Sequence, residues 1–283
     1  MLQDEISLSR ALLDADYTAR LTVTDAAFAR IIGDYKALTE VAQNSPNVRS
    51  ELEFCPATGL KLDLYGTRAG ERRPLVVFIH GGYWRALGRE HSGFAAPALA
   101  AQGIALAAPD YRLAPGASIT EIIGDCRRAI AFLWHNAERL GIDRSRIVVT
   151  GSSAGGHLAA AMAQPGWQAA LGLPDQPLHG CLPVSGLFEL APLAASHVQD
   201  WMRFTADEIA QSPLRHLPQD LAGAVALAAG KGETAGFHRQ SDAYAKATGW
   251  PLYGIENRNP FDVILDLADP KTPLFQQFVA LSA

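Results

Sequence analysis

The chain has 283 residues, of which 48% are hydrophobic and 19% charged, which is enough apolar material for a large core and excludes an intrinsically disordered chain. Its formal net charge of −5 argues against binding to nucleic acid or to an anionic membrane surface. Three widely spaced cysteines lack metal-type spacing, and the N-terminus is acidic with no long apolar run after it. We therefore expect a cytoplasmic protein that is free of disulfides and not embedded in a membrane.

The first 50 residues are polar and helical in pattern, and we expect residues 1–50 to lie over the main body as a flank or lid. Their apolar side chains fall near one helical face: Phe28, Ile31, Ile32, Tyr35 and Leu38. From residue 52 onward, short apolar runs alternate with helical patterns. Residues 60–66 alternate like a strand, and the runs predicted as buried strands are 75–80, 104–112, 146–151, 180–186, 224–230 and 251–256.

Between these runs, residues 119–140 and 154–164 read as helices. Alternation of strand and helix predicts one α/β domain, 1–283, with a doubly wound, mostly parallel sheet and helices on both faces. Residues 186–217 would form a helical lid insertion that caps the site. Ligands of such sheets bind at the carboxyl ends of the strands, so the chemistry is expected there.

The segment "RIVVTGSSAGGHLAAAM" carries the strongest functional signal. Gly151-Ser152-Ser153-Ala154-Gly155 fits the pattern G-x-S-x-G between a predicted strand and a predicted helix. Small residues on both sides permit the sharp turn that exposes a nucleophilic serine at the start of a helix. Ser153 is therefore the candidate nucleophile.

The segment "VVFIHGGYW" is a second signal, in which His80-Gly81-Gly82 follows a predicted buried strand about 70 residues before Ser153. Consecutive glycines let backbone N–H groups turn toward a ligand. Opposite Ser153, the amides of Gly82 and Tyr83 would join that of Ala154 in an oxyanion hole. His80, the first residue of this loop motif, is expected to hold the loop in place rather than to carry protons.

Together, "HGGYW", "DYRLAP" and "GSSAGGHLAA" resemble the α/β-hydrolase fold, in the branch of hormone-sensitive-lipase-type esterases and, more closely, kynurenine formamidases (arylformamidases). The resemblance runs from about residue 60 to the C-terminus. It implies an orienting carboxylate in a stretch G-x-x-[DE]-x-x-x-F-x-x-Q-S. Glu233 occupies that position, where the family usually has aspartate.

The resemblance also implies a catalytic histidine in a segment similar to N-H-F-D-V-I. Here the matching segment is "NPFDVI", and Pro260 stands at the histidine position. Proline has no titratable group and cannot take a proton from the serine. No histidine occurs from 239 to 283, which leaves His238, five residues after Glu233, as the candidate substitute base.

Three interpretations remain open. The chain is a serine hydrolase acting on an ester or an N-formyl or aryl amide, with impaired or atypical activity; or a pseudoenzyme that binds a small molecule; or an enzyme of non-hydrolytic chemistry, such as a lyase or cyclase. Loss of the base typically lowers kcat by about 10⁴–10⁶, while the oxyanion hole and binding retain about 10³ over the uncatalysed rate.

Aromatic residues on the loop and in the lid are candidates to line the substrate pocket: Tyr83, Trp84, Trp201, Phe204 and Phe188. They would suit a small, aromatic carbonyl substrate. No metal-binding cluster or phosphate-binding loop is present in the sequence, so we expect neither a metal nor a cofactor. The sequence leaves the oligomeric state open, with a homodimer as one option.

Overall fold

The computed structural model describes residues 2–281 except 69, 219–220, 222 and 224. Within these residues one sheet has the strand order β1-β2-β4-β3-β5-β6-β7-β8. β2 pairs antiparallel with both β1 and β4, and all the other neighbouring strands run parallel. The strands are β1 (Val48–Cys55), β2 (Leu60–Tyr65), β3 (Arg73–Ile79), β4 (Ala105–Pro109), β5 (Ile142–Ser152), β6 (Gly180–Val184), β7 (Leu227–Gly230) and β8 (Leu252–Ile255).

The central strands are buried on both faces, which explains why they read as continuous apolar runs. In β3, Leu75, Val77 and Ile79 belong to one core, whereas Val76 and Phe78 belong to the other. Successive side chains of a strand point to opposite faces, so a single run of apolar residues supplies both cores.

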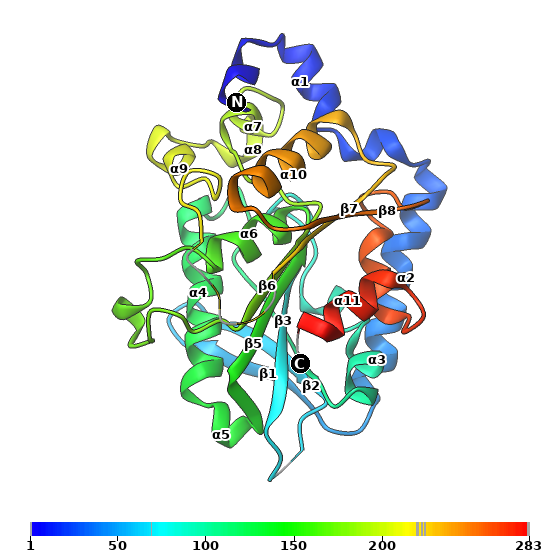
Figure 1. Ribbon diagram of the computed structural model, residues 1–283, viewed down its shortest axis with the longest axis vertical. Helices are drawn as coiled ribbons and strands as arrows, with labels where there is room; N and C mark the ends of the chain where they lie inside the picture. The colour runs from blue at the N-terminus through cyan, green and yellow to red at the C-terminus, as the bar shows by residue number, and fades with distance from the viewer. Residues whose placement is uncertain (1, 69, 219–220, 222, 224, 282–283) are drawn as a thin grey trace.

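Helices cover both faces of the sheet (Figure 1). One face carries α4 (Ile119–His135), α5 (Ala137–Leu140), α6 (Ala154–Met162) and α10 (Ala235–Thr248). The other carries α2 (Asp25–Gln43), α3 (Ala96–Ala101) and α11 (Pro273–Leu281). The segment predicted as one helix, 119–140, forms two helices, α4 and α5, which meet at Asn136. The Asn136 amide donates to the carbonyl of Phe132 at 3.1 Å.

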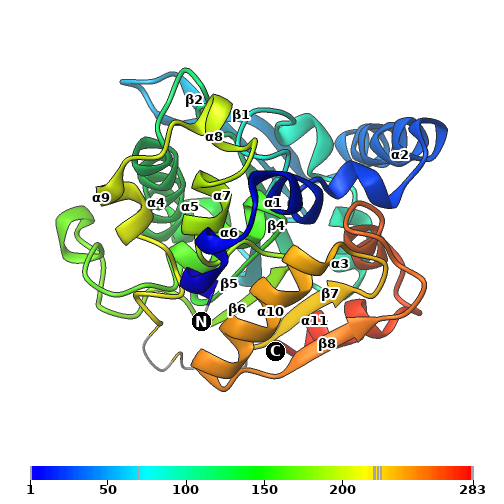
Figure 2. The same cartoon turned by 90° about the horizontal axis from the view of Figure 1, so that it is seen from above.

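Short helices gather beyond α6, the helix that follows the carboxyl end of β5 (Figures 1 and 2). They are α1 (Arg10–Asp16), α7 (Ala191–Ala194), α8 (Gln199–Met202) and α9 (Ala206–Ala210). Five 3-10 turns complete the described elements: η1 (Leu2–Ser7), η2 (Ala19–Thr22), η3 (Arg89–His91), η4 (Ala169–Leu171) and η5 (Val263–Ala268). The N-terminal segment and the lid insertion thus meet over the strand ends, where the site is expected from the sequence.

The predicted α/β-hydrolase fold is confirmed, including the mostly parallel sheet and the helices on both faces. β1, which was not predicted from the sequence, extends the sheet as an antiparallel edge strand in which Ser50, Glu51 and Glu53 are exposed. Its mixed polar sequence gives a weak strand signal because the strand has no second sheet neighbour to bury it.

Candidate active site

Ser153 lies at the turn between β5 and α6, with φ 58° and ψ −116°. A positive φ is costly for a residue with a Cβ and persists only where the surrounding structure imposes it. Here the close packing of the turn against β3 imposes the positive φ, and the flanking glycines make that packing possible. A Cβ on Gly155 would stand 2.0 Å from the Ile79 carbonyl oxygen, and a Cβ on Gly151 would stand 2.4 Å from the same oxygen. Only glycine fits on either side, so the G-x-S-x-G spacing follows from the packing of the turn against β3.

The loop after β3 makes a turn from Gly82 to Arg85, closed by the Arg85 amide, which donates to the Gly82 carbonyl at 3.1 Å. Three successive residues have positive φ: Gly82 at 94°, Tyr83 at 50° and Trp84 at 58°. Among the described residues, none accepts a hydrogen bond from the amides of Gly82 or Tyr83. A strained turn with free amides is a ready site for an anionic oxygen.

This loop is packed against the turn of Ser153. A Cβ on Gly81 would stand 2.7 Å from the Ser152 carbonyl oxygen and 3.6 Å from the Cβ of Ser153. Ala154, the next residue, is the first of α6, and the first amides of a helix have no intrahelical acceptor. The loop after β3 thus carries the amides of Gly82 and Tyr83, and the turn of Ser153 carries the Ser153 hydroxyl and the amide of Ala154. The two segments are in direct contact.

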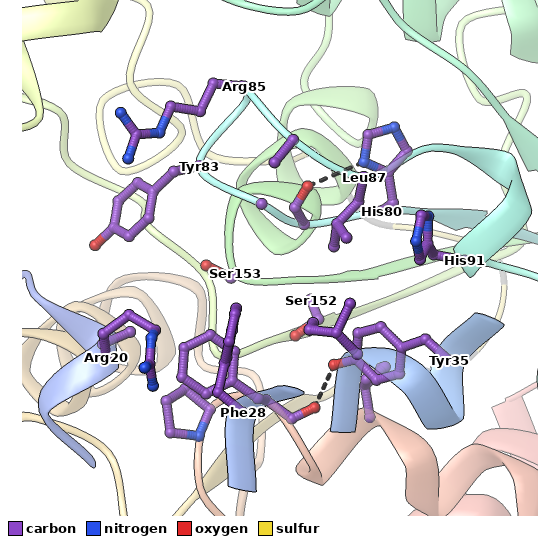
Figure 3. A pocket seen from close by; sticks show the side chains of 18 of the residues that line it. Arg20, Phe28, Tyr35, His80, Tyr83, Arg85, Leu87, His91, Ser152 and Ser153 are labelled. Atoms are coloured by element: carbon purple, nitrogen blue, oxygen red, sulfur yellow. Dashed lines mark hydrogen bonds between the residues drawn. The ribbon is translucent and has the colours of Figure 1, made fainter. Parts of the chain in front are cut away.

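His80 supports the loop, as its sequence position indicates. Its Nδ1 lies 2.9 Å from the Gly81 carbonyl oxygen (Figure 3). Its ring stacks on Tyr111, with the ring centroids 4.0 Å apart. The Tyr111 hydroxyl donates to the His80 carbonyl at 3.0 Å. Burial lowers the pKa of His80 to about 4, so the imidazole is neutral at physiological pH.

Glu233 is buried at the start of the segment that follows β7. Its Oε1 accepts hydrogen bonds from the Ser185 hydroxyl at 2.5 Å and from the Gly230 amide at 2.6 Å. Its Oε2 is buried without a partner among the described residues. Burial raises the pKa of Glu233 to about 7, and the two hydrogen bonds oppose that shift. An imidazole would ordinarily satisfy the second oxygen of such a carboxylate.

Pro260 lies on the loop beside Glu233. The Gly232 amide donates to the Arg258 carbonyl at 2.8 Å, and a Cβ on Gly230 would stand 2.6 Å from the same oxygen. Pro260 is buried, and it lines the same cavity as Ser153. The structure thus places Pro260 on a loop that touches the Glu233 loop on one side and on the wall of the Ser153 cavity on the other.

The cavity has a volume of about 310 Å³, within the usual range of ligand pockets. Three parts of the chain build its walls besides the turn of Ser153: the N-terminal segment, the loop after β3 and the C-terminal loop with Pro260 and Phe261. The lid insertion adds His197 and Trp201. Figure 3 shows Arg20, Phe28 and Tyr35 of the N-terminal segment across the cavity from Tyr83 and Arg85.

Tyr83 and Trp201 line this cavity, but Trp84, Phe204 and Phe188 do not. Trp84 is fully buried, with its ring edge-on to those of His157 and Phe204. Its positive φ turns it into the core although it follows a cavity residue in the sequence. The assignment of Trp84 and Phe204 to the pocket therefore differs from the structure: Trp84 is turned into the core, and the buried ring of Phe204 packs edge-on against it there.

Of the histidines, the candidate base His238 lies in α10 and does not line the cavity. His91 and His197 do line it, and neither was expected there from the sequence. His197 Nδ1 lies 3.3 Å from Asp14 Oδ1, and His91 Nδ1 lies 3.1 Å from Glu90 Oε1. The prediction that residues 186–217 cap the site could have indicated that His197 lies near the cavity. No sequence pattern around His91 indicates that it does.

In the part of the chain that the structure describes, no group of three or more histidine, cysteine or carboxylate side chains could hold a metal ion. No described helix is both long and apolar enough to span a membrane.

Comparison with known proteins adds to this geometry. The BD-FAE family model matches residues 62–172. The kynurenine formamidase of Salmo salar is 28% identical over 282 residues, which cover 95% of this chain and 92% of the relative. The carboxylesterase NlhH of Mycobacterium tuberculosis is 45% identical over 93 residues, or 32% of this chain and 29% of the relative.

Among solved structures, a putative thioesterase from Silicibacter sp. TM1040 superposes with a TM-score of 0.80 at 28% identity, covering 96% of this chain and 99% of that protein. Esterase B from Lactobacillus rhamnosis superposes with a TM-score of 0.68 at 22% identity, covering 91% of this chain and 93% of that protein, which is a likeness of fold. The chain is therefore an α/β-hydrolase. Within that class it is similar to enzymes named as kynurenine formamidase, carboxylesterase and thioesterase.

Proposed function

We propose that this protein cleaves an ester or an N-acyl aryl amide, with the Ser153 hydroxyl attacking the carbonyl carbon. The amides of Gly82, Tyr83 and Ala154 would hold the oxyanion of the tetrahedral intermediate. The observation that carries the proposal is the contact of Gly81 with the Ser153 turn, because it brings unpaired amides and a strained serine into one cavity. An acyl-enzyme would form and then be hydrolysed by water.

The preference for an aryl group has two supports. The cavity is lined by the rings of Phe28, Tyr83, Trp201 and Phe261. The relative that aligns over nearly the whole chain is named a kynurenine formamidase. Flat rings fit between aromatic walls of this kind because edge-to-face contacts stabilise them.

The weak point of the site is proton transfer. With Pro260 in the place expected for histidine, Glu233 would have no imidazole to orient, and no group at that position could take the proton of the Ser153 hydroxyl. Catalysis then depends on the oxyanion hole and on substrate positioning, which together are worth about 10³ over the uncatalysed rate. Activated aryl esters would turn over, and unactivated amides would turn over slowly.

Mass spectrometry of the protein after exposure to p-nitrophenyl acetate tests the proposal. We expect an acetyl group on the peptide that contains Ser153, and none in Ser153→Ala. Ser152→Ala is the matched control, because Ser152 lines the same cavity one residue earlier. Acetylation elsewhere, or equal turnover by Ser153→Ala, would contradict the covalent route.

A second function has one observation in its favour: the Oε2 of Glu233 is buried without a partner among the described residues. A chain without a working base can keep the cavity for binding, or for chemistry that needs only a polarised carbonyl. Saturable binding of an aryl carbonyl compound without acyl-enzyme formation would support this alternative.

A further inference from the structure

A second cavity lies on the flank of the molecule where α4, α9 and the segment after α6 come together (Figures 1 and 2). Its volume is about 560 Å³. α4 contributes Arg127 and Arg128 to the wall, and the lid insertion contributes Gln211 and His216. None of the described residues around it lines the Ser153 cavity, and α2, which does line that cavity, lies on the opposite side of the molecule. A ligand bound here would occupy a site of its own.

The wall of this flank cavity carries a positive charge that the protein does not neutralise. Arg128 forms an ion pair with Asp125, which is buried. Arg127 has no acidic partner in the described part of the chain, and its one hydrogen bond there runs from Nη2 to Gln164 Oε1 at 3.5 Å. The Nε of Arg127 is buried without a partner. No carboxylate is found among the described residues that line the cavity.

This unpaired charge is costly because Arg127 is half-buried. Burial lowers the pKa of Arg127 to about 10, which still leaves the guanidinium charged at physiological pH. A cation that is taken out of water without a counter-ion destabilises the folded state. An anionic ligand would supply the counter-ion that the described part of the protein does not.

The surroundings hold Arg127 in place. Its guanidinium carbon lies 5.4 Å from the ring centre of Trp167, within the range of a cation–π contact. Trp167 is buried, and its indole N–H donates to the Met162 carbonyl at 3.2 Å. Gln164 is also buried, and its Nε2 donates to the Gln211 carbonyl at 3.2 Å, which ties the lid insertion to the same wall. A guanidinium that is already fixed loses little freedom when it binds an anion.

The rest of the wall indicates the kind of anion. Pro165, Ala170 and Leu171 line the cavity together with Trp167, so part of its surface is apolar. A small inorganic anion would leave this surface uncovered, whereas the hydrocarbon part of an organic anion would cover it. Arginine suits a carboxylate because its planar donors match the two carboxylate oxygens.

We propose that the flank cavity is a second binding site, separate from Ser153, for a small organic carboxylate. The carboxylate pairs with Arg127, and the apolar body of the ligand lies against Pro165 and Leu171. The proposal goes beyond the proposed function and does not depend on it, because none of the described residues around the flank cavity takes part in the chemistry proposed at Ser153. A charged hydrogen bond to a half-exposed arginine corresponds to about a tenfold preference for the anion over a neutral isostere.

Calorimetry with benzoate and its neutral isostere benzamide tests the site. We expect the parent protein to have a site that binds benzoate about tenfold more tightly than benzamide, Arg127→Met to lack it, and Arg127→Lys to keep part of the preference. The matched control is Arg144→Met, because Arg144 lies over Trp134 at 5.5 Å outside this cavity and should bind as the parent does. Benzoate bound in the Ser153 cavity would survive Arg127→Met, since Arg127 does not line that cavity.

Urea unfolding of the same variants adds a second readout. Saturating benzoate should raise the unfolding midpoint of the parent and of Arg144→Met more than that of Arg127→Met, because only a ligand that binds the folded state stabilises it. Equal affinity of the parent for benzoate and benzamide, no benzoate binding by the parent, or binding that Arg127→Met leaves unchanged would each overturn the proposal. None of these outcomes depends on the turnover of an ester, so they leave the proposed function to its own test.

Discussion

Gly232 donates its amide to the carbonyl of Arg258 at 2.8 Å, and this hydrogen bond holds the loop of Glu233 against the loop of Pro260. In a triad the carboxylate orients the imidazole, so the two groups must be neighbours. In the proposed assignment Glu233 supplies the carboxylate and Pro260 stands where the imidazole would be, so the site would lack its base.

We predict that Pro260→His raises kcat on p-nitrophenyl acetate by about 10²–10⁴, the usual contribution of general-base catalysis. The substitution suits the local backbone: the Asn259 side chain caps the turn by accepting hydrogen bonds from the Phe261 and Asp262 amides at 2.9 and 3.1 Å. Neither bond needs proline. Steady-state kinetics of parent and variant measure the gain.

Pro260→Gln is the control for this experiment, because it also removes the ring and adds a polar group but no base. If kcat rises equally in Pro260→Gln and Pro260→His, the gain comes from a more flexible loop and not from a new base. A parent that is already fast, with no gain in Pro260→His, would mean that another group activates Ser153.

His238→Ala should change kcat by less than about threefold, since His238 lies on α10 outside the cavity lining. His197→Ala provides the comparison, because His197 lines the cavity and lies near the Asp14 carboxylate. Both rates are read on the same ester between pH 6 and 9. A collapse in His238→Ala alone would restore His238 as the substitute base.

The sequence predicts the centre of the site better than its walls. Gly151, Ser153 and Gly155 form a local motif whose spacing is dictated by contacts with Ile79, so the pattern survives in the sequence. Arg85 and Tyr35 meet the same cavity from segments far apart in the chain. The neighbouring sequence of neither residue predicts that the two line one cavity, because this depends on how the N-terminal segment crosses the strand ends.

Trp84 illustrates a second limit. Its neighbour Tyr83 faces the cavity, while Trp84 points into the core and is fully buried. Both have positive φ, a conformation that sequence alone does not reveal for aromatic residues. Assignment of adjacent aromatics to one pocket fails wherever the backbone turns between them.

Gly155→Ala should destabilise the protein by about 3 kcal/mol or more and abolish esterase activity. The new Cβ would lie 2.0 Å from the Ile79 carbonyl oxygen and 2.7 Å from that of His80, and neither backbone atom can move without displacing β3. Urea unfolding measures the change. Gly33→Ala is the opposite case: no atom lies within 4 Å of the place that a Cβ on Gly33 would take in α2, so a gain of about 0.5–1 kcal/mol is expected. Equal stability of Gly155→Ala and parent would contradict the tight turn.

Glu233→Gln should change how stability depends on pH. Burial raises the pKa of Glu233 from its ordinary 4.5 to about 7, so the folded protein holds a proton that the unfolded chain releases between those values. The favourable contribution of the protonated carboxyl is complete below pH 4.5 and is lost as pH rises through 7. One pKa unit is worth about 1.4 kcal/mol, so the loss is roughly 3 kcal/mol.

Glutamine keeps the oxygen that accepts from Ser185 and Gly230 and cannot ionise. The unfolding free energy of Glu233→Gln relative to the parent should therefore rise by up to about 3 kcal/mol between pH 4.5 and 8, measured by urea titration at each pH. Glu256→Gln is the matched control, because Glu256 is exposed and, among the described residues, forms an ion pair with Lys231 alone. Its difference from the parent should stay nearly constant over the same range. A constant difference for Glu233→Gln as well would contradict the raised pKa, because it would show that Glu233 ionises in the folded protein as it does in the unfolded chain.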